Sequence, residues 1–277
     1  MNTENVRMLW HYTDANGLLG LLRSRELWAS SVEYMNDAEE LMFGRRVIAD
    51  VAKEVCRTYG RSHEKDAYNP ALSDLRTWAA SVSGQLEGLE PDPGEPMAAF
   101  ATSFSSNGDQ LSQWRGYANG SGFAVGFDFV ALRELVGDRC GGVCRLHPIC
   151  YGQDARDFVE RFITHSWVNY WDPASIDDAK ENLLMHTSRL KHGAFNEEQE
   201  HRLIVLNPNV ESVKVRVRGA GLVPYLPIPL SSNAIKAVRV GPGNDQALQM
   251  NAAVIALQST GFVGDVEVSV SEAPFRN

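Results

Sequence analysis

The sequence has no excess of positive charge, few cysteines and no long hydrophobic run. Its 26 Lys and Arg residues are outnumbered by 35 Asp and Glu residues, which gives a formal net charge of −9. This balance argues against broad non-specific binding of nucleic acid, which needs clustered positive charge to displace counterions, but it permits a local basic groove. Because no apolar run approaches membrane-spanning length and the N-terminus lacks a secretory signal pattern, we expect a cytoplasmic protein with no membrane partner.

Cysteine is scarce, and in the cytoplasm the four that occur are expected to be reduced. They are Cys56, Cys140, Cys144 and Cys150. With His147, the last three form the pattern C-x3-C-x2-H-x2-C, and these residue types can bind zinc. The spacing fits no common zinc module, so we expect no metal, and a structural metal site is the alternative. A phosphate-binding loop, a nucleophile elbow and a clear carboxylate set for a metal-dependent nuclease are also absent.

The 277 residues are 44% apolar and 22% charged, which is typical of a globular chain with a substantial core. Apolar periodicity predicts helices at 38–59, 71–89, 111–117, 130–136, 155–170, 175–192 and 244–257. Strands are predicted at 98–104, 123–129, 143–151 (broken at Pro148), 201–206, 213–217, 222–226, 235–240 and 266–270. We expect one domain over residues 1–277, with a helical insertion at about 38–96 that ends in a proline-rich acidic loop.

The stretch from Met8 to Ser31 reads as a strand, a helix and a second strand. Asp14 is a candidate N-cap, because its carboxylate can accept free backbone N–H groups of the first turn. His11 ends the first strand beside Thr13 and the start of the helix. A histidine placed there can hold a sugar hydroxyl, and the alternative is a buried, hydrogen-bonded core histidine.

This stretch resembles the first signature of the ADP-ribosyltransferase fold. The matching residues are Leu9, Trp10, His11, Tyr12, Thr13, Asn16, Leu21, Leu22 and Leu27. The resemblance implies that His11 binds the ribose of NAD, with Tyr12 and Thr13 beside it. Tyr12 replaces the glycine of the polymerase branch, so that branch's substrate is not inferred.

A second informative stretch runs from Phe100 to Ala118, where a strand ending near Ser103 leads into a helix. On that helix Trp114 and Tyr117 are three residues apart and share a face, so they can stack a nicotinamide or adenine ring. Arg115 can pair with a pyrophosphate. Similarity to ADP-ribosyltransferases makes Ser112 and Tyr117 the best counterparts of that family's helix. The candidate binding residues are Ser103, Gln113, Trp114, Arg115 and Tyr117. The alternative is that the aromatic residues anchor the helix to the core.

A third stretch, from Phe195 to Leu206, places acidic residues directly before an apolar strand. Glu198 and Glu200 are two apart and would project to the same side of an extended backbone. The Glu-x-Glu pattern is similar to that of ADP-ribosyltransferases, which implies that Glu200 is catalytic and that Glu198 orients the acceptor. The alternative is a solvated acidic turn, with Glu200 paired to Arg202 or Lys191.

The chain also looks like an uncharacterised bacterial domain-of-unknown-function family linked to AbiGi-type abortive-infection proteins. Its shared features are His-Tyr-Thr at 11–13, Asn36, Asp37 and Glu40, Leu-Ser-Gln-Trp-Arg-x-Tyr-Ala at 111–118, Gly-Phe-x-x-Gly-Phe at 122–127 and Glu-x-Glu-x-Arg-Leu at 198–203. The resemblance implies phage defence or a toxin activity by association.

Together these resemblances imply an α+β fold with an ADP-ribosyltransferase-like split antiparallel sheet and helical insertions. The expected activity is NAD-dependent ADP-ribosyl transfer or NAD hydrolysis, with NAD as substrate and an unknown protein or nucleic acid as acceptor. A carboxylate would stabilise the positive charge that builds on the ribose as nicotinamide leaves. The alternative is a non-catalytic binding module of the same fold, such as an antitoxin or phage sensor.

Overall fold

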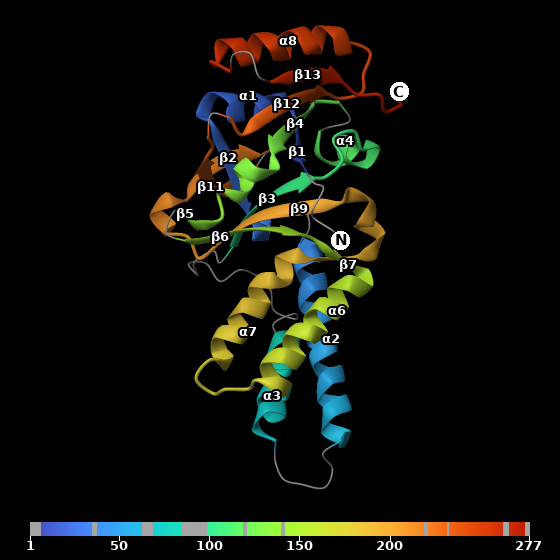
Figure 1. Cartoon of the computed structure of the whole chain (residues 1–277), viewed down its shortest axis with the longest axis vertical. Helices are drawn as coiled ribbons and strands as arrows, with labels where there is room; N and C mark the ends of the chain where they lie inside the picture. Colours follow the sequence, from blue (N-terminus) through green and yellow to red (C-terminus); the bar gives the residue numbers. More distant parts are fainter. Residues whose placement is uncertain are drawn as a thin grey trace. The chain divides into compact units, whose positions relative to one another are not determined.

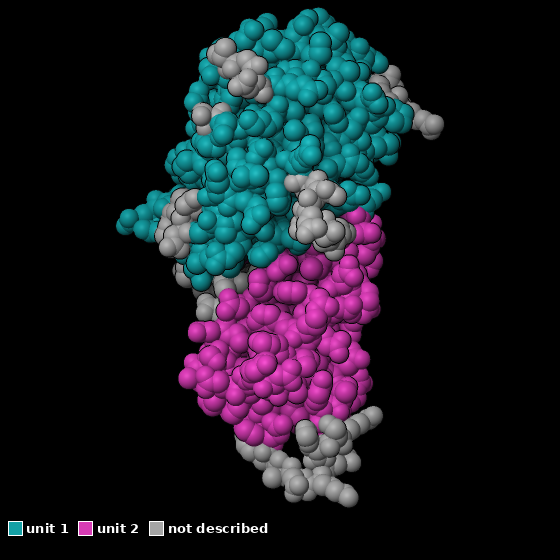
Figure 2. All heavy atoms as spheres, viewed as in Figure 1, with its two compact units in different colours: residues 1–31, 99–148, 197–277 teal, residues 32–98, 149–196 magenta. Residues whose placement is uncertain are grey.

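The computed structural model describes residues 7–34, 38–62, 69–84, 99–118, 121–139, 142–218, 221–231, 233–262 and 266–274. The chain divides into two compact units, drawn in teal and magenta in Figure 2. Unit 1 comprises residues 1–31, 99–148 and 197–277, and unit 2 comprises residues 32–98 and 149–196. The helical insertion expected at about 38–96 therefore forms one compact unit with a second segment, 149–196, that the sequence did not group with it.

Unit 1 is built on a large, mostly antiparallel sheet. Its strands are β1 (Met8–Thr13), β2 (Glu26–Ser31), β3 (Ala99–Ser105), β4 (Phe123–Asp128), β5 (Gly137–Arg139), β6 (Gly142–Pro148), β9 (Glu200–Leu206), β10 (Lys214–Arg218), β11 (Gly221–Pro229), β12 (Ile235–Val240) and β13 (Glu267–Val270). Their order is β10-β11-β2-β3-β1-β4-β12-β13, and β9, β6 and β5 continue from β3. Among the described strand pairs of this sheet, only β12 and β13 run parallel. Helix α8 (Gln246–Ser259) connects these two strands and packs on both (Figure 1).

The sheet forks along β3. Strand β9 covers one edge of β3 completely, from Ala99 opposite Leu206 to Ser105 opposite Glu200. The other edge is shared, because β2 pairs with the start of β3 at Phe100 and Ala101, whereas β1 pairs with its end at Ser105. A strand has only two hydrogen-bonding edges, so β1 and β2 separate here, and residues 102–104 lie between their two ladders.

Helix α1 (Ala15–Ser24) connects the two arms of the fork. The Asp14 side chain accepts a hydrogen bond from the Gly17 amide at 2.7 Å, which confirms the predicted N-cap. The helix ends at Arg25, whose φ of 56° is left-handed and stops the helix. Its apolar face buries Leu18, Leu21 and Leu22. The remaining helices of unit 1 are α4 (Leu111–Tyr117), α5 (Phe129–Arg133) and the short η6 (Val210–Ser212).

Unit 2 is helical. Its elements are η2 (Val32–Tyr34), α2 (Ala38–Ser62), α3 (Pro70–Gly84), α6 (Gly152–Ile163), η3 (Thr164–Asn169), α7 (Ile176–Met185) and η4 (His186–Arg189), with a two-strand pair β7 (Cys150–Tyr151) and β8 (Leu190–Lys191); η5 (Gly193–Glu198) crosses into unit 1. The core centres on Trp167, which stacks on Trp78 with ring centroids 5.3 Å apart and donates its indole N–H to Asp74 at 2.9 Å. Burying an aromatic ring this way stabilises the helix packing and satisfies its polar atom.

Most predicted elements occur within a few residues of their expected positions. The helix expected at 175–192 is an exception, since α7 ends at Met185 and a 3₁₀ turn and β8 follow. The break expected at Pro148 is confirmed, because β6 ends there and β7 begins at Cys150. Asn36 and Asp37, which belong to the features shared with the uncharacterised family, and the proline-rich loop at 90–96 lie outside the described residues. No described helix has both the length and the apolar character needed to cross a membrane.

Candidate functional site

His11 lies at the fork of the sheet and is held by β3. Its Nδ1 atom lies 2.9 Å from the carbonyl oxygen of Ser103, a residue between the β2 and β1 ladders. Because a carbonyl oxygen only accepts hydrogen bonds, Nδ1 carries the proton and the neutral ring keeps Nε2 as an acceptor. Burial lowers the pKa of His11, the Ser103 hydrogen bond opposes that effect, and the positive charge of Arg216 lowers it further. The ring therefore favours the neutral form, which can accept a hydrogen bond from a hydroxyl.

Strand register determines which side chains share a face of the sheet. Residues directly opposite one another project to the same side, and so do alternate residues of one strand. Ala101, Ser103 and Ser105 alternate along β3 and thus define one face, called here the Ser103 face. The partners of these three residues belong to the same face: Ser30, Ile204, Arg202, Glu200 and Trp10.

The same register separates His11 from Glu200. His11 follows Trp10, so its Cβ projects away from the Ser103 face, and its ring contacts Phe104 with centroids 5.9 Å apart. Glu200 lies on the Ser103 face, one strand beyond β3. The fold thus brings both residues to the same end of three neighbouring strands. The link between them is Ser103, whose carbonyl contacts His11 and whose register partner is Arg202.

Glu200 is buried, with 5% of its surface exposed, and forms a two-point ion pair with Arg202. Arg202 donates from Nε to Oε1 at 2.5 Å and from Nη2 to Oε2 at 3.1 Å. This is the Arg202 pairing that the sequence left as the alternative. The guanidinium fixes the carboxylate in one position and stabilises its negative charge.

The expectation that Glu198 and Glu200 extend side by side from one strand is wrong. Glu198 ends the 3₁₀ turn η5, and Gln199 has a left-handed φ of 46°, so β9 begins only at Glu200. The end of β3 holds this turn: Ser105 donates its hydroxyl to the Glu198 carbonyl at 2.8 Å, and the Ser106 amide donates to the Gln199 carbonyl at 3.1 Å. Glu198 therefore lies on a turn next to the strand and is itself buried.

The residues predicted on α4 separate into a buried and an exposed group. Trp114 is completely buried, packs edge-on against Tyr12 with ring centroids 4.7 Å apart, and donates its indole N–H to Asp109 at 2.8 Å. Trp114 thus has no exposed surface for a ligand ring, which corrects that expectation and favours the anchoring role. Gln113 is buried as well, whereas Arg115 and Tyr117 are exposed.

Tyr12 and Thr13 have structural contacts at the end of β1. The Tyr12 hydroxyl donates to the Asn107 carbonyl at 2.8 Å and accepts from the Gln110 amide at 2.9 Å. Thr13 packs against Gly17 at the start of α1, where its side chain occupies the space that a Cβ would take. Both residues therefore fix the loop and helix that flank the strand.

Asp109 precedes α4 and accepts three hydrogen bonds from other parts of unit 1 and from α4 itself. Its carboxylate accepts hydrogen bonds from Trp114, from the Ser271 hydroxyl and from the Glu272 amide, the last at 2.7 Å. The residue at the N-cap of α4 is Gln110, which makes no side-chain capping bond. Burial opposes ionisation of Asp109, but these three hydrogen bonds and the charge of Arg239 lower its pKa. Asp109 thus joins the α4 loop to the segment after β13.

The β2 arm holds a basic and aromatic cluster that was not predicted from the sequence. Arg216 of β10 donates from Nη2 to the Ser30 hydroxyl at 3.0 Å, and its guanidinium carbon lies 5.5 Å from the Trp28 ring centroid. Trp28 in turn contacts Tyr225 of β11, with ring centroids 5.3 Å apart. The signal that could have found this cluster is the Lys-Val-Arg-Val-Arg run at 214–218, which places basic residues on one face of a strand.

Several buried polar atoms at the fork have no hydrogen-bond partner among the described residues. They are the Trp28 indole nitrogen and the hydroxyl oxygens of Ser31, Thr102 and Ser103. Continuing the β2–β3 register by two residues from the Ser30–Ala101 pair would place Trp28 opposite Ser103. The register places Trp28 and Ser103 on the Ser103 face, and Ser31 and Thr102 on the opposite face. Leaving a buried polar atom unsatisfied costs about 1–3 kcal/mol, so each of these atoms is a candidate contact for a ligand.

The possible zinc ligands do not form a complete set in the described structure. Cys140 lies outside the described residues, and Cys144 is buried in β6 opposite Val205. His147 belongs to unit 1, whereas Cys150 belongs to unit 2. Within the described ranges, no three His, Cys, Asp or Glu residues are grouped so that they could hold a metal ion.

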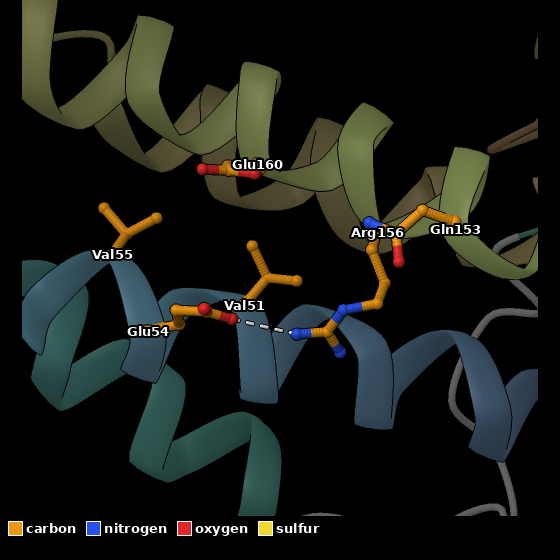
Figure 3. A pocket seen from close by; sticks show the side chains of 6 residues that line it. All are labelled: Val51, Glu54, Val55, Gln153, Arg156 and Glu160. Atoms are coloured by element: carbon orange, nitrogen blue, oxygen red, sulfur yellow. Dashed lines mark hydrogen bonds and ion pairs between the residues drawn. The ribbon is translucent and has the colours of Figure 1, made fainter. Parts of the chain in front are cut away.

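Unit 2 has a surface pocket of about 240 Å³ between α2 and α6, shown in Figure 3. Glu54 and Arg156 lie across it as an ion pair at 3.0 Å, and both are substantially exposed. An exposed pair of this kind contributes little energy. The lining residues are Val51, Glu54, Val55, Gln153, Arg156 and Glu160. None of them was predicted from the sequence to be a catalytic or binding residue.

The fold defines a mixed α/β protein whose mostly antiparallel sheet forks along one strand and whose second unit is helical. Residues 113–203 match the family model described as "Protein of unknown function (DUF2971)". This segment runs from α4 to β9 and contains Glu198 and Glu200 but neither His11 nor Ser103. The match supports a relation to an uncharacterised family. No curated protein and no solved structure matches the chain significantly.

Proposed function

We propose that the protein cleaves the nicotinamide–ribose bond of NAD at the fork and transfers the ADP-ribose to an acceptor or to water. The observation that carries the proposal is the ladder across β1, β3 and β9, in which Trp10 pairs with Ser105 and Ser105 with Glu200. It connects the strand of the predicted ribose-binding histidine to the strand of the predicted catalytic glutamate. The fork itself supports the split antiparallel sheet of the ADP-ribosyltransferase type.

The proposed chemistry follows from charge. Breaking the bond to the cationic nicotinamide builds positive charge on the ribose, and a fixed carboxylate stabilises that charge more than it stabilises the ground state. Glu200 would supply the carboxylate, which Arg202 holds in place on the Ser103 face. His11 projects away from the Ser103 face, so the proposal requires the ribose to reach it between the separated ladders of β1 and β2. There Nε2 of His11 would accept a hydrogen bond from a ribose hydroxyl, since its Nδ1 is engaged by Ser103. Tyr117, exposed on α4, is the remaining aromatic candidate for contact with nicotinamide.

The acceptor in this proposal is a protein or nucleic acid, or water in the case of hydrolysis. A role in phage defence or as a toxin in the cytoplasm rests only on the resemblance to abortive-infection proteins. Depleting NAD or modifying a macromolecule would fit such a role. No membrane partner is included in the proposal.

A second candidate function is a non-catalytic binding module, such as an antitoxin or phage sensor. The specific observation that favours it is the buried ion pair between Glu200 and Arg202. A carboxylate already neutralised by a guanidinium has less charge to offer to a cationic sugar. Under this alternative the protein binds NAD or another ligand without turnover.

An NAD-cleavage assay on the full chain separates the two candidates. Replacement Glu200→Gln is expected to abolish nicotinamide release while NAD binding, measured by calorimetry, is retained. Glu197→Gln is the matched control, because Glu197 is exposed and lies three residues away on the adjoining turn. If the wild-type protein binds NAD without releasing nicotinamide, the binding module replaces the enzyme; if it neither binds nor cleaves NAD, both NAD-based candidates are wrong.

A further inference from the structure

Arg216 lies on the Ser103 face at the β2 arm, where Ser30 and Trp28 contact its guanidinium. On β10 it pairs with Val223, and Val223 lies two residues before Tyr225, the register partner of Ser30. Arg216 therefore shares a face with Ser30, which accepts its hydrogen bond. Its guanidinium also lies over the Trp28 ring, and Trp28 packs against Gly20 of α1. A guanidinium fixed in this way loses little conformational freedom when it binds an anion.

The surroundings of Arg216 contain the donors and acceptors that a ligand would need. The Trp28 indole nitrogen and the Ser103 hydroxyl are buried and have no hydrogen-bond partner in the described ranges. The charge of Arg216 reaches His11, where it contributes to the lowered pKa of that ring. Arg216 lies on the Ser103 face and His11 projects from the other face of the neighbouring arm, so the fork has a cation on one side and a neutral histidine on the other. This combination suits a ligand that carries both an anionic group and a sugar hydroxyl.

We propose that Arg216 binds a phosphate of a nucleotide ligand at the fork, with Ser30 and Trp28 fixing the guanidinium. The proposal rests on the proposed function for the position of the ribose, and it adds the position of the pyrophosphate. Arginine suits this role because its planar donors match two phosphate oxygens at once. The proposal assigns phosphate binding to Arg216 and no longer to Arg115. Arg115 is exposed on the short helix α4 and makes no hydrogen bond or ion pair with the described residues.

Calorimetric titration with three probes tests this assignment. The probes are ADP-ribose, inorganic pyrophosphate and adenosine, which has a ribose but no phosphate. Replacement Arg216→Gln is expected to weaken binding of ADP-ribose and pyrophosphate by about tenfold or more, as for the loss of a charge-assisted hydrogen bond, with adenosine unchanged. Lys214→Gln is the matched control: it removes the same charge from the same strand and face, but from an exposed side chain. Lys214→Gln and Arg115→Gln are expected to change affinity by less than about threefold.

The outcomes distinguish this inference from the proposed enzyme. If Arg216→Gln binds pyrophosphate as the wild type does, or if adenosine binding falls equally, Arg216 is not the phosphate-binding residue, whatever the NAD-cleavage result. The same conclusion follows if the wild type binds neither phosphate probe. If NAD is not cleaved but Arg216→Gln selectively loses phosphate binding, the phosphate site stands and the enzymatic function fails.

A second measurement keeps the test valid if Arg216→Gln does not fold. Proton NMR of the wild-type protein follows the ring signals of His11 during titration with pyrophosphate. An anion bound at Arg216 adds negative charge near His11, so the pKa of that ring is expected to rise on binding. Unchanged His11 signals at saturating pyrophosphate would overturn the assignment.

Discussion

The Nδ1 atom of His11 and the carbonyl oxygen of Ser103 form a 2.9 Å hydrogen bond at the point where β1 leaves β3. The bond satisfies a carbonyl that lies between the ladders of β1 and β2. It also fixes the tautomer of the histidine, because the proton must reside on Nδ1. A side chain thus completes the hydrogen bonding of β3 where the sheet forks, and it does so at the proposed ligand site.

Breaking the Glu200–Arg202 pair from one side is expected to destabilise unit 1. Glu200→Gln leaves a buried guanidinium without its carboxylate, which costs about 3–5 kcal/mol. The double replacement Glu200→Gln with Arg202→Met removes both charges and is expected to cost less than the two single replacements together. Urea unfolding of the four proteins gives the coupling energy. Additive costs would show that the two side chains act independently.

Asp109 is expected to be the main attachment of the segment after β13. Asp109→Ala removes acceptors for Trp114, Ser271 and the Glu272 amide, so we expect a loss of about 2–4 kcal/mol in unfolding free energy. Asp245→Ala is the matched control, because Asp245 is exposed at the N-cap of α8 and makes no side-chain capping bond. Hydrogen exchange of the Glu272 amide should accelerate only in the Asp109 variant; equal protection in both variants would contradict the assignment.

Two helical glycines should respond in opposite directions to alanine. A Cβ at Gly20 would lie 2.5 Å from the Trp28 ring, so Gly20→Ala is expected to cost about 1–3 kcal/mol by overpacking. A Cβ at Gly116 would meet nothing within 4 Å, so Gly116→Ala is expected to stabilise α4 by up to about 1 kcal/mol. Thermal unfolding measures both changes, and the fluorescence of Trp28 is expected to shift only in the first variant. If Gly20→Ala unfolds at a higher temperature than the wild type, the Trp28 indole must be able to move away from the added methyl group.

His186 is expected to make stability depend on pH below neutrality. Burial, and then the charge of Arg189, lower its pKa from 6.5 to about 4, and its ring packs against Phe158 and Phe162. The histidine binds a proton near pH 6.5 in the unfolded chain but only near pH 4 in the folded protein. Burial of the neutral ring therefore contributes fully to the free energy of unfolding above pH 6.5, and this contribution is lost as the pH falls from 6.5 to 4. The loss is at most about 3 kcal/mol.

The control for this titration is His186→Gln, which has no titrating ring at this position. Urea unfolding at pH 7 and pH 4.5 is expected to show a smaller difference for the variant than for the wild type. An identical pH dependence in the two proteins would place the acid sensitivity elsewhere, for example at His11 or His201, whose pKa values burial also lowers.

Local patterns in the sequence predicted the elements better than they predicted the site. The Asp14 cap and the break at Pro148 follow from short-range chemistry, and both are confirmed. The turn at Gln199 could not be read in this way, because hydrogen bonds from Ser105 and Ser106, far away in the chain, hold it. Likewise, the environment of Arg216 depends on strand order, which places β11 beside β2 and β10 on the far side of β11.

The fork has a consequence for how the chain is made. Strand β3 pairs with β1, which is synthesised about a hundred residues earlier, and with β9, which is synthesised about a hundred residues later. Contacts this distant close slowly, because the loop entropy must be overcome before any pairing stabilises the product. Until β9 leaves the ribosome, one whole edge of β3 remains a bare row of amides and carbonyls, the kind of edge that recruits strands from other molecules. A nascent chain arrested before Glu200 is therefore expected to be the aggregation-prone form of this protein.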